Sequence, residues 1–171
     1  MSEDVTRRAF GVAGGGALAA MALTGTASAQ EKADDGVKTE FLFDVVGELE
    51  DPIDMGKLPE GARQIYYMKG GTVEGPRIKA TVLPGGGDWF RTRGDGVGLL
   101  DVRVVIKTDD GALIYITYRG MVHQNADGLY FRTTPWFETS SEKYAWLNKV
   151  MAIGIGTPSP GKITYKVYAI K

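Results

Sequence analysis

Short runs of alternating apolar and polar residues, punctuated by glycine, fill the chain from Thr39 onward and constrain its fold most strongly. In the first run, Phe41, Phe43 and Val45 recur with the two-residue period of a β-strand. Further β-rich runs cover 65–68, 78–83, 97–107, 112–122, 129–133 and 162–170. This pattern predicts an all-β, mainly antiparallel domain.

Glycine turns join several of these runs. Asp109-Asp110-Gly111 separates 97–107 from 112–122, and Asn125-Ala126-Asp127-Gly128 precedes 129–133. Asp-Gly between two β-rich runs is a signal for a tight antiparallel hairpin. About eight strands joined in this way favour a barrel or a sandwich. We expect a single closed or nearly closed barrel, because closure removes exposed strand edges.

One segment departs from the β pattern. Thr139-Ser140-Ser141-Glu142 has the sequence of a capping box, and Tyr144, Leu147 and Met151 follow at helical spacing. We therefore expect one short helix near residues 140–150, packed against the sheet.

Residues 1–29 have the three parts of an export signal. Arg7 and Arg8 precede a weakly apolar run, and Ala27-Ser28-Ala29 supplies the small residues of a cleavage site. The arginine pair predicts the twin-arginine route; an accidental pair in a general secretory signal is the alternative. We expect a periplasmic or otherwise exported protein, with 30–38 as a flexible lead-in and 39–171 as the barrel domain.

The chain that remains after cleavage has nearly balanced charge. Residues 1–29 contain two of the 20 basic and two of the 21 acidic residues, so the net charge stays at −1. No basic stripe is apparent along the sequence, and we expect neither a nucleic-acid partner nor membrane insertion of the mature form. There is no cysteine, and His123 is the one histidine. Because neither a thiolate nor a multi-histidine metal site can form, we expect no metal and no cofactor.

Asp101 and Arg103 are the leading catalytic candidates. They are two residues apart on a predicted strand, so their side chains share one face, opposite the apolar side chains of Val102 and Val104. If the apolar row faces the core, the pair is simply solvated. If the pair faces a polar lumen, the arginine could stabilise an oxyanion while the aspartate moves a proton.

Aromatic and polar side chains on other segments are candidate ligand contacts. Gly85-Gly86-Gly87 could let the backbone approach a ligand and present Asp88 and Trp89 at a rim; the alternative is a strand connection with Trp89 in the core. Tyr115, Tyr118 and Arg132 lie on strands where they could grip an oxygenated or aromatic molecule, although tyrosine is common in strands by propensity alone.

The segment around the predicted helix adds four candidates, with Phe137, Trp146 and Asn148 as ligand contacts and Glu138 as a third catalytic residue. Glu138 stands just before the helix, where the helix dipole favours its charged form. The alternative is that the aromatic side chains form the core against which the helix docks.

The ordered motifs of the chain resemble those of the DUF3237 family. They are G-A-R-Q-I (61–65), G-G-T-V-E-G-P (70–76), L-P-G-G-G-D-W (83–89), D-G-(x)4-L-D-V-R (95–103), D-D-G-A-L-I-Y (109–115), Y-F-R-T-T-P-W-F-E-T (130–139) and Y-A-W-L-N (144–148). The resemblance implies a compact, mainly antiparallel β-barrel with a central pocket, and it is compatible with a homodimer. It implies no particular reaction.

Two functions fit these observations. The first is an exported, cofactor-independent lyase, isomerase or cyclase that acts on a small oxygenated or aromatic metabolite through acid–base chemistry. The second is a non-catalytic periplasmic barrel in which the same side chains only orient a small-molecule ligand.

Overall fold

Ten strands and one helix make up the part of the protein, residues 36–171, that a computed structural model describes. The strands are β1 (Thr39–Leu49), β2 (Ile53–Leu58), β3 (Gly61–Gly75), β4 (Ile78–Val82), β5 (Gly87–Thr92), β6 (Gly98–Thr108), β7 (Leu113–Asn125), β8 (Gly128–Glu138), β9 (Ala152–Ser159) and β10 (Lys162–Ile170). The export signal expected at residues 1–29 lies outside the described residues.

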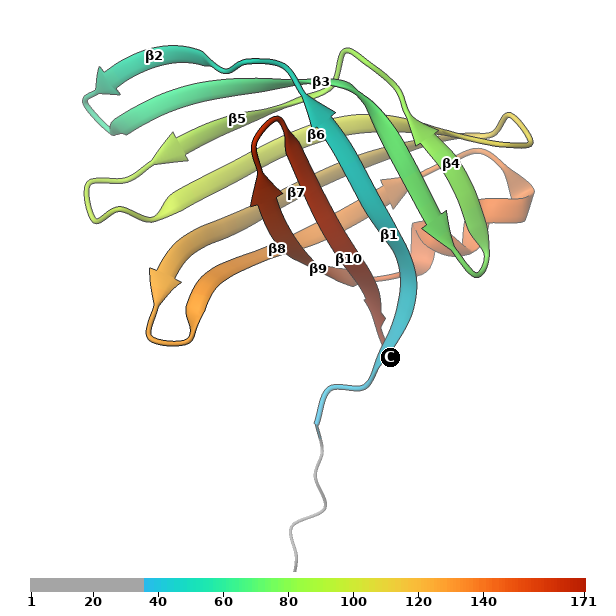
Figure 1. Cartoon of the computed structure of the whole chain (residues 1–171). Helices are drawn as coiled ribbons and strands as arrows, with labels where there is room; N and C mark the ends of the chain where they lie inside the picture. The colour runs from blue at the N-terminus through green and yellow to red at the C-terminus, as the bar shows by residue number, and fades with distance from the viewer. Residues whose placement is uncertain (1–35) are drawn as a thin grey trace, which may run out of the picture. The chain divides into compact units, whose positions relative to one another are not determined.

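The strands form a closed antiparallel barrel (Figure 1). Its wall runs β1-β10-β9-β8-β7-β6-β4-β3 and closes because β3 also pairs with β1. Two positions in the wall hold two strands each: β5 continues the position of β4 between β3 and β6, and β2 continues that of β1 along β3. The ten strands therefore occupy eight positions, which confirms the predicted barrel of about eight strands.

Glycine turns connect the strands as the sequence predicts. Gly111 and Gly128, in the turns before β7 and β8, have φ of 89° and 111°. Side chains other than glycine rarely adopt this left-handed region, so these turns depend on glycine.

The inner face of the wall holds the core, and strand alternation decides which side chains reach it. In β6, Leu100, Val102, Val104 and Ile106 point inward and are at most 8% exposed. The largest fully buried side chains of the described chain include Phe43, Ile114 and Phe137, which fill one half of the barrel. The other half remains partly open.

A short 3₁₀ helix, η1 (Glu142–Lys149), follows β8 and buries Tyr144 and Leu147. The predicted capping box is wrong: the cap residue is Ser141, and no side chain caps the helix. Thr139 instead donates its hydroxyl to the carbonyl of Leu113, 2.7 Å away on β7. Met151, which we expected on the buried face of the helix, is also placed differently. The helix ends at Lys149, and Met151 is exposed just before β9.

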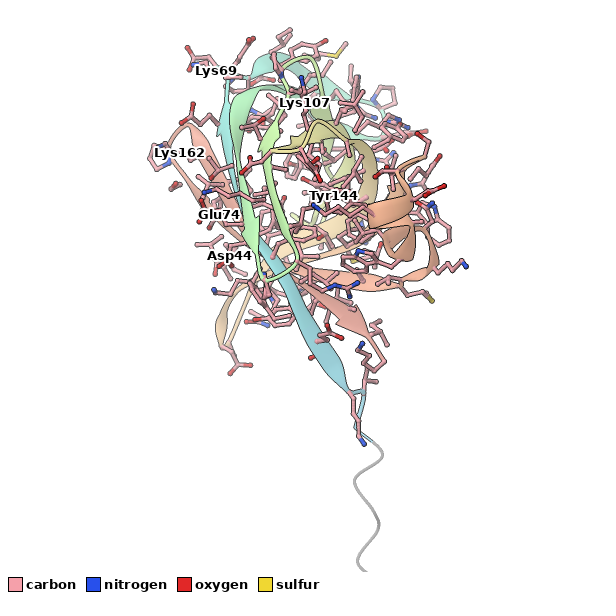
Figure 2. The ribbon with its side chains drawn as sticks, turned by 90° about the vertical axis from the view of Figure 1, so that its right-hand side faces the viewer. Asp44, Lys69, Glu74, Lys107, Tyr144 and Lys162 are labelled. Carbon is pink, nitrogen blue, oxygen red and sulfur yellow. The ribbon has the colours of Figure 1, made fainter. Side chains whose placement is uncertain are left out.

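Ion pairing fixes this helix to the barrel. Asp110, in the β6–β7 turn, accepts hydrogen bonds from Lys143 Nζ at 2.5 Å and from the Tyr144 hydroxyl at 3.2 Å. Figure 2 labels Tyr144 near the middle of the view, beside the ribbon of η1, and Lys69 and Lys162 toward its left edge. None of the described residues belongs to a helix with the length and apolarity needed to cross a membrane.

Candidate functional site

The open half of the barrel contains a cavity of about 420 Å³. Its wall is mostly apolar, with Met68, Phe90, Val102 and Phe131 among the lining residues. One half-buried carboxyl, Asp88, and three tyrosine side chains, Tyr66, Tyr118 and Tyr165, interrupt this surface, and the exposed Glu50, Asp51 and Lys162 also border it. A concave apolar chamber with a few converging polar groups is the usual form of a small-molecule site.

Strand register places these polar residues at one level of the barrel. Asp88 on β5 is paired with Tyr66 on β3 and, on its other side, with Val102 on β6. Val102 is in turn paired with Tyr118 on β7. Alternation points all four side chains inward. Tyr165 extends into the same region from β10, a strand in another part of the barrel wall. Its ring packs edge-on against that of Tyr118, with the ring centroids 5.5 Å apart.

Asp88 is the chemically distinctive group of the cavity. Burial raises its pKa from 3.8 to about 6, and the hydrogen bond from the Asp101 amide opposes that rise. The negative charge of Asp101 raises the pKa further, whereas Arg63 lowers it. A carboxyl with such a pKa exists in both the acid and the carboxylate form near neutral pH, as a general acid–base group requires.

The tyrosines around Asp88 stay protonated. Burial is the main reason that the pKa of Tyr66, Tyr118 and Tyr165 is raised, and the charge of Asp88 adds to the effect in each case. The Tyr66 hydroxyl donates to Gln64 Oε1 at 3.0 Å. These hydroxyls can therefore orient an oxygenated ligand by hydrogen bonding, while Asp88 is the one of these four groups whose pKa allows a change of protonation near neutral pH.

The sequence left two orientations open for Asp101 and Arg103, and in the structure both side chains point outward. Both are on the outer face of β6, where their side chains form an ion pair with Oδ1 and Nη1 3.2 Å apart and are 43% and 48% exposed. The lumen role expected for them is wrong, because the apolar row of β6 faces inward. Asp101 nevertheless reaches the cavity through its backbone amide, which donates to Asp88 Oδ1 at 3.0 Å.

Glu138 also lies outside the cavity. It is exposed at the end of β8, opposite the outward-facing Tyr115 of β7. Trp89 and Arg132 are on the outer face as well, on β5 and β8. Together with Asp101 they line a separate outer hollow, and Arg103 is absent from its lining. The three predicted catalytic side chains therefore do not converge.

The remaining candidates have structural contacts. Phe137 is 2% exposed and packs edge-on against Phe43, so it belongs to the core. Trp146 on η1 is covered by the guanidinium of Arg77, 3.8 Å from the ring centre. Asn148 binds the backbone of Thr139 at both its amide and its carbonyl, and so holds η1 to the end of β8. The docking alternative explains Phe137 and Trp146, and the hydrogen bonds of Asn148 give it a structural role that this alternative did not include.

Asp88 and Tyr118 are thus the two predicted ligand contacts that line the cavity. Tyr66 and Tyr165, which the sequence analysis missed, complete it. Alternation places Tyr66 on the same strand face as Met68 and Tyr165 on the same face as Val167, and the structure shows that both faces point inward. Within residues 36–171, no three His, Asp or Glu side chains lie close enough together to hold a metal ion.

The fold and the cavity define a small antiparallel β-barrel with a chamber sized for a small molecule. The family model "Protein of unknown function (DUF3237)" matches residues 37–170. The chain belongs to this family.

Several relatives share most of the barrel. A UPF0311 protein of Clostridium acetobutylicum is 34% identical over 148 residues, which cover 77% of this chain and 92% of the relative. The crystal structure of a beta-barrel like protein from Acinetobacter baumannii superposes with a TM-score of 0.77 at 31% identity, covering 82% of this chain and all of that one.

A fungal enzyme is also similar. The "Hydroalkoxylation enzyme phnH" of Penicillium herquei is 36% identical over 107 residues, which cover 62% of this chain and 64% of the enzyme. The crystal structure of an enzyme from Penicillium herquei superposes with a TM-score of 0.67 at 26% identity and covers 79% of this chain and 95% of that one.

Proposed function

We propose that this protein is a cofactor-independent acid–base enzyme whose active site is the barrel cavity and whose proton-transferring group is Asp88. The observation that carries the proposal is the Asp88 carboxyl, half-buried in a mostly apolar chamber, with its pKa raised to about 6 by burial. Desolvated carboxyls of this kind are characteristic of sites that move protons at neutral pH.

The cavity favours a neutral ligand with an apolar body and at least one hydroxyl group. No arginine lines it. Its one lysine, Lys162 at the start of β10, is exposed, and so are Glu50 and Asp51, which follow β1. A cavity of about 420 Å³ accommodates one or two rings. The tyrosine hydroxyls would bind the oxygen of such a ligand and hold it beside Asp88.

The similarity to the Penicillium hydroalkoxylation enzyme supports hydroalkoxylation as the proposed reaction class. Hydroalkoxylation adds an O–H group across a C=C bond, so it breaks one O–H bond and one π bond and forms one C–O and one C–H bond. No oxidant or reductant is consumed. Within one molecule the reaction closes a ring, which makes it an isomerising cyclisation.

Asp88 can carry both proton transfers. In its acid form it donates a proton to one alkene carbon, and the π electrons form the new C–H bond. The hydroxyl oxygen then bonds to the other alkene carbon and releases its proton, which returns to the Asp88 carboxylate. The apolar wall excludes water, which would otherwise compete with the hydroxyl for the same carbon.

The experiment that tests this function uses 2-(3-methylbut-2-enyl)phenol, a neutral phenol whose trisubstituted alkene accepts a proton readily. The full chain is expected to convert it to the cyclic ether of identical mass, detectable by chromatography. Asp88→Asn should reduce the rate at least about 100-fold, because general acid–base groups typically contribute that much. Glu138→Gln makes the same chemical change on the outer wall and should leave the rate unchanged.

Two results would contradict this function. Equal turnover by Asp88→Asn and the wild type would remove Asp88 from the chemistry. Binding of the phenol in the cavity without turnover by either protein would instead support the non-catalytic ligand-binding barrel.

We also propose that the protein is exported by the twin-arginine route, on the basis of Arg7, Arg8 and Ala27-Ser28-Ala29. Fractionation of cells that express the full chain should find a shortened protein outside the cytoplasm. Replacing both arginines with lysine should keep the full-length chain inside. Unchanged export of that variant would indicate the general secretory route.

A further inference from the structure

A second hollow, of about 830 Å³, lies on the outer face of the barrel wall. It extends across β3, β5, β6, β7, β8 and the start of β9, and the side chains of four arginines line it: Arg63, Arg91, Arg119 and Arg132. They are far apart in the sequence, and strand pairing brings them together. Arg63 is directly opposite Arg91, and Met121 beside Arg119 is opposite Arg132.

Three of these arginines, Arg63, Arg119 and Arg132, form no salt bridge with an acidic side chain among residues 36–171, although the charge of Arg63 also acts on Asp88 inside the barrel. Arg91 pairs with Glu60 at 2.6 Å, and Asp101, the one carboxylate in the lining, pairs with Arg103 outside it. Arg63 donates to the backbone carbonyl of Trp89 at 2.7 Å, and Arg132 donates to that of Phe131 at 3.0 Å. The hollow is therefore positively charged on a protein whose net charge is −1.

Apolar and aromatic side chains separate the guanidinium groups. Trp89, Met121 and Ile153 line the hollow, and Met121 is 49% exposed without a covering side chain. Arg132 lies over the ring of Tyr130, 4.8 Å from its centre, which fixes its planar group at the rim. Guanidinium groups bind carboxylates, sulfates and phosphates in a bidentate manner, while the apolar side chains favour a hydrophobic body.

We infer that this outer hollow is a second binding site, distinct from the cavity inside the barrel, for a small organic anion with an aromatic or otherwise planar apolar body. Arg119 and Arg132 bind the anionic group, and Trp89 and Met121 contact the body of the ligand. The inner cavity, with no arginine in its wall, selects neutral molecules. The two sites thus differ in the charge of the ligand that they accept.

A matched pair of fluorescent probes tests this inference. 8-Anilinonaphthalene-1-sulfonate carries the aromatic body and an anionic group, and N-phenyl-1-naphthylamine has the same body without the charge. We expect Arg119→Gln/Arg132→Gln to weaken binding of the sulfonate about tenfold and to leave binding of the neutral probe within about twofold. Lys79→Gln/Lys149→Gln, which removes two exposed charges elsewhere, should change neither affinity.

Salt provides an independent readout on the unmodified protein. Raising the ionic strength from about 0.05 to about 0.5 M should weaken binding of the sulfonate but not of the neutral probe, because a partly exposed ion pair is screened. Sulfonate binding that is unaffected by both the arginine substitutions and salt would overturn the inference. A wild-type dimer in analytical ultracentrifugation that dissociates on Arg119→Gln/Arg132→Gln would also overturn it, because a second copy would then occupy the hollow.

Discussion

The backbone amide of Asp101 donates a hydrogen bond to the side-chain oxygen Oδ1 of Asp88, 3.0 Å away, although the Asp101 side chain points out of the barrel. The β5–β6 ladder is interrupted at this place, between the Asp88–Val102 pair and the Arg91–Leu99 pair. The carboxyl of Asp88 therefore replaces a backbone acceptor in the wall. This contact fixes the inward side chain of Asp88 at the cavity surface.

Loss of that acceptor should destabilise the protein. We predict that Asp88→Ala lowers the free energy of unfolding by about 1–3 kcal/mol, the usual cost of an unsatisfied buried amide. Asp88→Asn keeps an oxygen at the same place and should avoid this cost. Urea denaturation at pH 5 compares the two variants, and equal stabilities would show that the Asp101 amide finds water instead.

The raised pKa of Asp88 predicts a specific dependence of stability on pH. Between pH 3.8 and about 6, the folded state holds a proton on Asp88 that the unfolded state has released. Stability from this group is complete below pH 4 and is lost as the pH rises through about 6, amounting to about 3 kcal/mol in all. Relative to the wild type, Asp88→Asn should therefore gain stability from pH 4 to pH 7. Parallel stability curves would contradict the raised pKa.

The charge of the outward-facing Asp101 side chain should affect the pKa of Asp88 inside the barrel. Burial is the main cause of the raised pKa of Asp88, and the carboxylate of Asp101 adds to it. We expect Asp101→Asn to lower the pKa of Asp88 while preserving the amide hydrogen bond. The free energy of unfolding of Asp101→Asn is compared with that of the double variant Asp88→Asn/Asp101→Asn across the pH range. The pH at which the difference between them is half-complete reports the pKa of Asp88. If this pH is the same as in the Asp101 background, solvent screens the two carboxyls from each other.

Phe137 and Trp136 provide a test of wall orientation, because they are neighbours on opposite faces of β8. Phe137 is 2% exposed, whereas Trp136 is 54% exposed. Phe137→Ala should lower the free energy of unfolding by about 3–5 kcal/mol through the cavity that it leaves in the core. Trp136→Ala should cost less than about 1 kcal/mol. Thermal or urea unfolding of both variants measures the difference, and similar losses would indicate the wrong strand register.

Much of the fold could be predicted from the sequence because its signals are local. The alternation in 39–49 and the Asp-Gly turns at Gly111 and Gly128 depend on neighbouring residues alone, and the structure has strands and turns there. The helix near residues 140–150 is also present, but its capping was mispredicted because Thr139 bonds to Leu113, far away in the sequence.

The site was harder to predict, because alternation identifies two faces of a strand without showing which one is inside. For β6 the charged face attracted the catalytic assignment, yet the apolar face with Val102 and Val104 fills the interior. The cluster of Arg63, Arg91, Arg119 and Arg132 was invisible for a related reason. No two of these residues are closer than 13 positions apart, and the pairing of β3, β5, β6, β7 and β8 brings them together.

The most direct measurement of the central claim is a ¹³C NMR titration of the Asp88 carboxyl carbon, assigned by comparison with Asp88→Asn. We predict a midpoint at about pH 6 in the free protein, which moves when 2-(3-methylbut-2-enyl)phenol occupies the cavity and displaces water from the carboxyl. A midpoint near pH 3.8 that is unaffected by the phenol would show Asp88 to be an ordinary solvated carboxylate. That result would contradict an acid–base site inside the barrel.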